Sequence, residues 1–164
     1  LAPAGGFTEI DADNVMAKAL DFTWKREVPV LYIVAELDSI LPLKGMEDMF
    51  NRNPDPKTMV VLLNADHFHF NDAIEQTHDG YKLLLGMLAE GMDEDTRHST
   101  ETMMAGMKPS SELVAGADAY ALINGLGLAH FDRELRGSQE AASFLRGDLV
   151  AILAEHHINV KLLF

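Results

Sequence analysis

The sequence predicts a mixed α/β fold built on a short parallel sheet. Two stretches, residues 28–35 and 58–63, are apolar at nearly every position, which is typical of parallel strands that helices cover on both faces. A helical pattern lies between them, and helical periodicity continues from Asp72 almost to the last residue. We therefore expect a sheet flanked by helices and followed by a helical tail.

Composition agrees with a folded domain. The chain has 164 residues, 48% of them hydrophobic and 24% charged, so it can bury a core. Its net charge of −13 disfavours nucleic acid and anionic membranes as partners. The absence of cysteine excludes disulfides, thiolate metal ligands and cysteine nucleophiles. The longest apolar run, residues 28–35, is too short to span a bilayer.

Two segments precede the first strand. Residues 1–6 contain proline and two glycines and predict a loop. Residues 11–22 are acidic and place apolar side chains at helical spacing, with Asp11 or Asp13 as a capping residue. We expect a helix there.

The next elements form a βαβ unit. The strand at residues 28–35 has Pro29 near its start, where a missing backbone donor is tolerated. Residues 44–53 predict a short amphipathic helix, which the sequence Asn-Pro-Asp-Pro ends. The strand at residues 58–63 follows. Because the connection is short and helical, we expect the two strands to be parallel neighbours.

Beyond the second strand the pattern is mainly helical. Three helices are expected, marked by the cluster Leu83, Leu84, Met87 and Leu88 and by residues 113–135 and 138–156. Residues 93–108 are polar, rich in methionine and without strong periodicity, so we expect a mobile loop. Only residues 159–164 offer a further strand. The sheet is therefore expected to be short of neighbours.

Two loops carry carboxylate and imidazole side chains that could take part in acid–base catalysis. Parallel strands place their carboxyl ends on one edge of the sheet, ~5 Å apart when they are adjacent. Glu36 and Asp38 follow the first strand, and Asp66, His67 and His69 follow the second. A carboxylate from the first loop can therefore meet an imidazole from the second, which is the acid–base half of a hydrolytic triad.

The amino-acid sequences of both loops and of the strand before the first loop resemble those of a known family. Residues 28–38 are Val-Pro-Val-Leu-Tyr-Ile-Val-Ala-Glu-Leu-Asp, and residues 66–72 are Asp-His-Phe-His-Phe-Asn-Asp. Together they resemble the C-terminal half of an α/β-hydrolase, with Ala35 where that family usually has glycine. The second stretch is similar to the His-x-x-Phe-x-Asp sequence of members like platelet-activating-factor acetylhydrolase and dienelactone hydrolase. Residues 1–5 resemble the end of the preceding strand in that family.

The resemblance implies both an architecture and an activity. Residues 1–91 would be the C-terminal βαβ part of an α/β-hydrolase domain, with its parallel sheet flanked by helices, and residues 92–164 a helical C-terminal tail on the same domain. The activity would be that of a serine esterase acting on a small-molecule ester without a cofactor. Asp38 would be the triad acid and His67 the triad base, with His69 as the rival base. Glu36 and Asp66 would be surface charges or supporting groups.

The nucleophile of such an enzyme is missing from the sequence. The family carries its serine in a Gly-x-Ser-x-Gly turn that precedes the acid and the histidine, and no serine here has glycines at that spacing. The chain also starts at Leu1 rather than methionine. We therefore expect sequence upstream of residue 1 to supply the serine and the oxyanion hole, either as an N-terminal half that is a separate or cleaved chain or as a further segment of the same chain. The lack of cysteine and of a visible signal peptide favours the cytoplasm.

Three alternatives stay open. His67 and His69, with Asp66, Asp72 and His78, form a set of possible metal ligands, although no cysteine or His-Glu-x-x-His motif accompanies them. The methionines 103, 104 and 107 are candidates for an acyl pocket or for simple core filling. The third alternative is a non-catalytic, mainly helical interaction module that has hydrolase-like loops.

Overall fold

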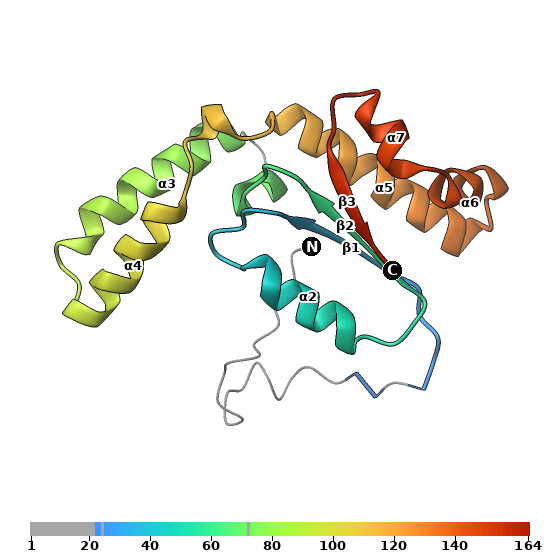
Figure 1. The fold of residues 1–164 in the computed structure, drawn as a ribbon, viewed down its shortest axis with the longest axis horizontal. Helices are drawn as coiled ribbons and strands as arrows, with labels where there is room; N and C mark the ends of the chain where they lie inside the picture. Colours follow the sequence, from blue (N-terminus) through green and yellow to red (C-terminus); the bar gives the residue numbers. More distant parts are fainter. Residues whose placement is uncertain (1–21, 24, 72) are drawn as a thin grey trace.

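A computed structural model describes residues 22–23, 25–71 and 73–164 (Figure 1). The loop expected over residues 1–6 lies outside these residues, as does the helix expected over residues 11–22, apart from Phe22. Asp72 also lies outside them. In the described part of the chain, no helix combines the length and the apolar character needed to cross a membrane.

A three-stranded sheet lies at the centre of the fold. β1 (Val30–Ala35) and β2 (Lys57–Leu62) are parallel neighbours, with Ala35 opposite Leu62. β3 (Val160–Leu163) pairs antiparallel with β2, so the strand order is β1-β2-β3 and β1 lies at an edge of the described sheet. The predicted βαβ unit is confirmed, and the strand expected over residues 159–164 is present.

One face of the sheet is covered by α2 (Leu43–Arg52), the helix that the sequence predicts between the two parallel strands. Met46 and Phe50 of α2 pack on Tyr32 and Val34 of β1. The rings of Phe50 and Tyr32 meet edge to face, with their centroids 5.7 Å apart. Leu31 and Ile33, the alternate residues of β1, point to the opposite face of the sheet.

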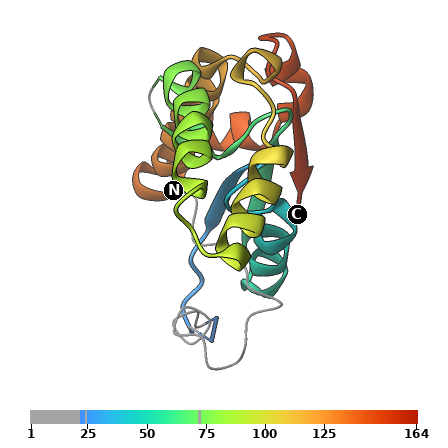
Figure 2. The same ribbon diagram turned by 90° about the vertical axis from the view of Figure 1, so that its left-hand side faces the viewer.

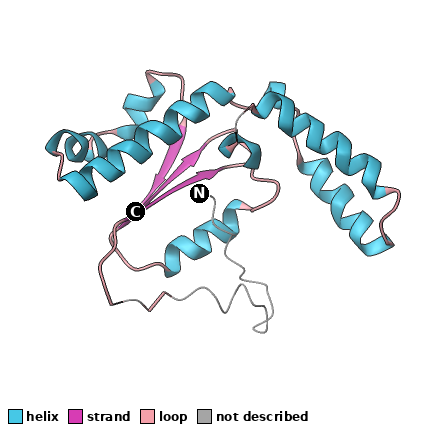
Figure 3. Ribbon diagram, turned by 180° about the vertical axis from the view of Figure 1, so that it is seen from behind, coloured by secondary structure: helices cyan, strands magenta, loops and turns pink. Residues whose placement is uncertain are grey.

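The opposite face is covered by α5 (Gly116–Arg136) and α7 (Leu149–Ala154), so that helices flank both sides of the strands (Figure 3). The core on this side consists mainly of aliphatic side chains: Val60, Leu62, Leu122, Leu126, Leu149, Leu153 and Val160. Alternate residues of β2 thus enter two different cores. This arrangement explains why β2 is apolar at successive positions.

The predicted helix over residues 138–156 is in fact two helices. α6 (Gln139–Arg146) ends before Gly147, and α7 begins after Asp148. The side chain of Asp148 accepts a hydrogen bond from the Ala151 N–H at 3.1 Å and so caps α7. The break has a local cause, because glycine and a capping aspartate end one helix and start the next.

The prediction of a mobile loop over residues 93–108 is wrong. α4 (Glu94–Gly106) is a helix that packs beside α3 (Ile74–Ala89), and the two form a hairpin that projects from the sheet (Figures 1 and 2). Asp93 caps α4 by accepting a hydrogen bond from the Thr96 N–H at 3.0 Å. Acidic residues in the first turn add favourable interactions with the helix dipole. These end effects outweigh the weak apolar periodicity.

Candidate catalytic site

Asp38 and His67 meet at the edge of the sheet where β1 and β2 end. Asp38 lies in the loop after β1, and His67 begins the short 3-10 helix η1 (His67–Phe70) after β2. The Nδ1 atom of His67 is 3.0 Å from Oδ2 of Asp38. The side chain of Asp38 is 5% exposed and that of His67 is 23% exposed, so the imidazole alone reaches the surface. The structure thus brings together the two residues that the sequence predicts as acid and base.

The carboxylate of Asp38 is held by the backbone of its own loop. Its Oδ1 accepts hydrogen bonds from the N–H groups of Ile40 at 3.0 Å and Leu41 at 2.6 Å. Such a turn is ordinary for an aspartate that follows a strand. It fixes the carboxylate so that Oδ2 faces the imidazole.

The contact also determines which nitrogen of His67 carries the hydrogen. A carboxylate only accepts hydrogen bonds, so Nδ1 is the donor and Nε2 of the neutral ring has a free lone pair. No hydrogen bond from a described residue reaches Nε2. The hydrogen bond to Asp38 raises the pKa of His67; desolvation opposes this, and the charges of Asp38 and Asp66 reinforce it. The imidazole therefore has the tautomer and the charge stabilisation that a general base needs.

We compared the chain with family models, curated proteins and solved structures. No family model, curated protein or solved structure matches this chain. The chemical assignment therefore rests on Asp38 and His67 themselves.

His69, the rival base, has no free nitrogen. Its Nδ1 accepts a hydrogen bond from the Asp66 N–H at 2.9 Å, and its Nε2 lies 2.9 Å from the Val114 carbonyl oxygen. The residue is 3% exposed. His69 therefore joins η1 to the segment before α5. The partners of His69 therefore differ from the partner of His67, which is Asp38. The described residues contain no group of three or more side chains that could hold a metal ion.

Asp66 directly precedes His67 and contacts both the loop after β1 and α3. It is 1% exposed, and its Oδ1 accepts a hydrogen bond from the Ser39 hydroxyl at 3.0 Å, which links the loop after β2 to the loop after β1. The Nδ1 atom of His78 in α3 is 3.7 Å from the same oxygen. Asp66 is therefore a buried supporting group and not a surface charge.

His78 is a site residue whose place the sequence did not reveal. The side chain is fully buried, its Nε2 donates to the Lys108 carbonyl oxygen at 2.7 Å, and its Nδ1 has no hydrogen-bond partner. The ring of Phe68 packs against it edge to face. From the sequence, His78 was expected only as a possible metal ligand. Its spacing of four residues from Ile74 on one helix face is the signal that points to burial.

Glu36 and Asn64 fix the path of the backbone next to the site. Glu36 is exposed, and its carboxylate accepts a hydrogen bond from the Asn64 N–H at 2.8 Å. Asn64 has a positive φ of 55° and donates from its side chain to the Glu112 carbonyl oxygen at 2.6 Å. Its own carbonyl oxygen accepts from the Val114 N–H. Residues 112–114 thus lie against the loop after β2 and hold it in place.

No described serine is bonded to the imidazole of His67. The hydroxyl of Ser39 donates to Asp66, that of Ser110 donates to Asp79, and that of Ser138 caps α6. Within the described residues the site therefore consists of an acid and a base, with a free nitrogen on the base.

Proposed function

We propose that this chain is part of a carboxylic-ester hydrolase of the α/β-hydrolase type, in which Asp38 is the triad acid and His67 is the general base. The observation that supports the proposal is the contact of 3.0 Å between His67 Nδ1 and Asp38 Oδ2, with Nε2 unoccupied by any described residue. That arrangement orients the imidazole for proton transfer at Nε2.

The reaction would proceed in two halves. In the first, a serine hydroxyl attacks the acyl carbonyl of the ester while its proton passes to Nε2 of His67. Asp38 stabilises the imidazolium, which then protonates the departing alcohol oxygen. In the second half, water attacks the acyl-enzyme and gives its proton to Nε2. Collapse of this intermediate releases the carboxylic acid and returns the proton to the serine oxygen.

The serine and the oxyanion hole belong, in this proposal, to polypeptide outside the sequence shown. The surroundings of β1 support this arrangement. β1 lies at an edge of the described sheet but has no charged residue, whereas exposed edges are usually protected by charge. A cavity of about 530 Å³ beside it is lined mainly by apolar side chains, among them Leu31, Ile33, Phe70, Leu128 and Phe131. A further strand and its side chains would fill this space.

A fluorophosphonate probe tests the proposal, because it labels an activated serine covalently. In natively purified material the probe should label a serine upstream of residue 1, either in a second polypeptide or in a longer form of this chain, and His67→Ala should abolish the labelling. His98→Ala is the matched control, since His98 is an exposed histidine on α4. Labelling that is equal in the wild type and in His67→Ala would show that His67 does not activate the serine.

The second candidate function is a non-catalytic, mainly helical interaction module. It is favoured by the α3–α4 hairpin, in which the apolar side chains of Leu83 and Met87 are exposed. Native material that contains this chain alone, folds cooperatively and takes no label would favour this function over the esterase.

A further inference from the structure

Exposed apolar side chains lie on α3 of the α3–α4 hairpin. Leu83, Leu84, Met87 and Leu88 of α3 are between 48% and 68% exposed. Their spacing of three and four residues places them on one side of the helix. The hairpin projects away from the sheet (Figure 1), and these four side chains stay exposed to solvent in the described fold. Exposed apolar side chains gathered on one helix face are typical of an interaction surface.

α4, the second helix of the hairpin, receives little stabilisation from packing against the described fold. None of the residues of α4 is buried, although the helix lies along α3. A helix of this length is marginal in water without tertiary packing. Additional contacts along the hairpin would therefore stabilise α4.

A groove runs between the two helices. It has a volume of about 780 Å³ and is lined on its apolar floor by Leu83, Gly86 and Met87 of α3 and by Met104 and Ala105 of α4. A Cβ added at Gly86 would meet no atom within 4 Å, so the space above that position is open. Methionine side chains adapt to partners of different shape. An amphipathic helix laid into such a groove buries its apolar face against the floor.

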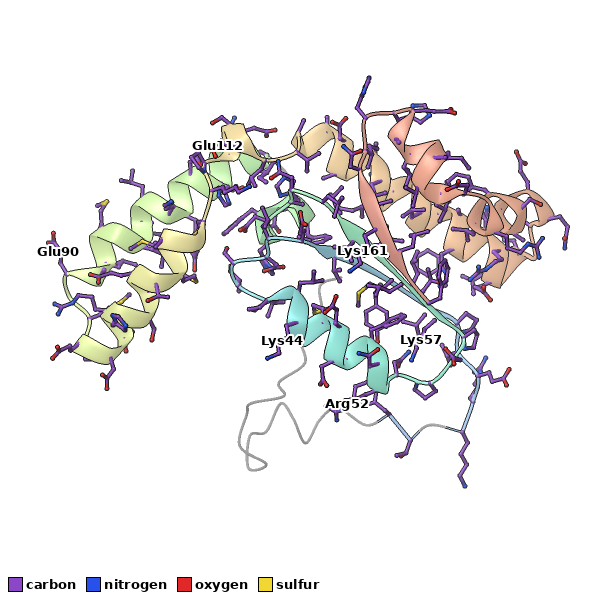
Figure 4. The ribbon with its side chains drawn as sticks, in the orientation of Figure 1. Lys44, Arg52, Lys57, Glu90, Glu112 and Lys161 are labelled. Carbon is purple, nitrogen blue, oxygen red and sulfur yellow. The ribbon has the colours of Figure 1, made fainter. Side chains whose placement is uncertain are left out.

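The rim of the groove is acidic. Asp79, Glu90 and Glu101 border it, and Lys82 is the one basic side chain among its described lining residues. The ammonium group of Lys82 already donates to the Met107 carbonyl oxygen at 2.6 Å. Hydrogen bonds from Ser110 lower the pKa of Asp79 and keep it ionised. Glu90 extends from the end of α3, far from the sheet (Figure 4).

This charge distribution decides between possible occupants. A second copy of the chain would bring another net charge of −13 to the acidic rim. Residues 1–21 have a net negative charge, with Glu9, Asp11, Asp13 and Asp21 against Lys18. The acidic rim of the groove would therefore repel this segment as well. We propose that the α3–α4 groove binds a cationic amphipathic helix of a partner protein. This inference goes beyond the proposed function and is independent of the ester chemistry.

The probe for this proposal is a synthetic leucine–lysine amphipathic helix of about 14 residues, roughly 21 Å long. Its binding to the whole chain is measured by fluorescence anisotropy. Saturable binding is expected, and the dissociation constant should rise roughly tenfold in the variant Glu90→Lys/Glu101→Lys, because two favourable charge contacts become repulsive. Met87→Ser should weaken binding to a similar extent, since Met87 is 67% exposed and its replacement leaves the fold intact.

Matched controls are available away from the hairpin. Leu135→Ser removes an apolar side chain of α5 that is 78% exposed, and Glu155→Lys reverses an exposed charge after α7. Both should bind the peptide like the wild type. Equal binding of a peptide with the same composition but without the amphipathic repeat would overturn the proposal. It would also fail if the hairpin variants bound normally, or if the chain formed dimers that Met87→Ser abolished.

Discussion

Asp38 and His67 are 29 residues apart in the sequence, yet their side chains meet at 3.0 Å. The distance is short because the strands that precede them are parallel and adjacent, so that both loops leave the sheet at the same edge. Backbone N–H groups hold the acid, and the acid in turn orients the base.

The pH dependence of stability should report this contact. The pKa of His67 is raised in the folded protein, chiefly by its hydrogen bond to Asp38. The stabilisation is therefore fully present below the ordinary histidine pKa of about 6.5 and is lost as the pH rises through the higher folded value. Urea unfolding of the wild type and Asp38→Asn should differ more at pH 5 than at pH 9. A difference that is independent of pH would contradict the assignment.

If the proposed esterase is assembled with its serine, the same variant should impair its catalysis. Asp38→Asn no longer fixes the Nδ1–H tautomer of His67, so turnover should fall by roughly 10⁴-fold, as expected for loss of a triad acid. Ester hydrolysis by wild type should rise with pH through the raised pKa of His67, because only the neutral imidazole accepts a proton. Steady-state kinetics against pH measure both effects. A rate that falls over that range would show that a protonated group is required instead.

The negative charge of Asp66 should help to raise the pKa of His67. Asp66→Asn keeps an oxygen that accepts from Ser39 but removes a negative charge that raises the pKa of His67. The pKa of His67, followed by NMR of the imidazole nitrogens in this chain alone, should therefore decrease. Ser39→Ala is the companion variant, which loses the hydrogen bond at a cost of about 1 kcal/mol and retains the charge. If both variants leave the His67 titration unchanged, Asp66 has only a structural role.

Two glycines of α5 should respond to alanine in opposite directions. A Cβ at Gly116 would lie 2.6 Å from Cγ2 of Ile74 and 3.1 Å from Oε1 of Glu75, so Gly116→Ala should destabilise the fold by about 1–3 kcal/mol. A Cβ at Gly125 meets nothing within 4 Å, and Gly125→Ala should stabilise the helix by roughly 0.5–1 kcal/mol. Thermal and urea unfolding measure both changes. Equal effects at the two positions would refute the close packing at Gly116.

The central part of the fold could be predicted because its determinants are local. The doubly apolar strands, the amphipathic helix with Met46 and Phe50, and the acid and base after the strands all follow from short stretches of sequence. Parallel pairing then brings Asp38 and His67 to one edge. Their catalytic role stays a prediction that kinetics must test.

The helical hairpin shows why the rest could not be predicted. The apolar cluster at residues 83–88 correctly indicates a helix, but Leu83 and Met87 are exposed, while His78 and Leu85 are buried instead. Periodicity identifies a helix without saying which face another element will cover. The supporting contacts of the buried histidines depend on carbonyl groups that are distant in the sequence: His69 contacts Val114, and His78 contacts Lys108.

The pairing of β3 with β2 has a consequence for folding. β2 receives its second neighbour only when Val160 aligns with Leu62, so the central strand of the described sheet stays half paired until residues 160–163 have been synthesised. Such a late, long-range contact slows folding and exposes an apolar strand in the meantime. The nascent chain should therefore depend on chaperones more than its size alone suggests.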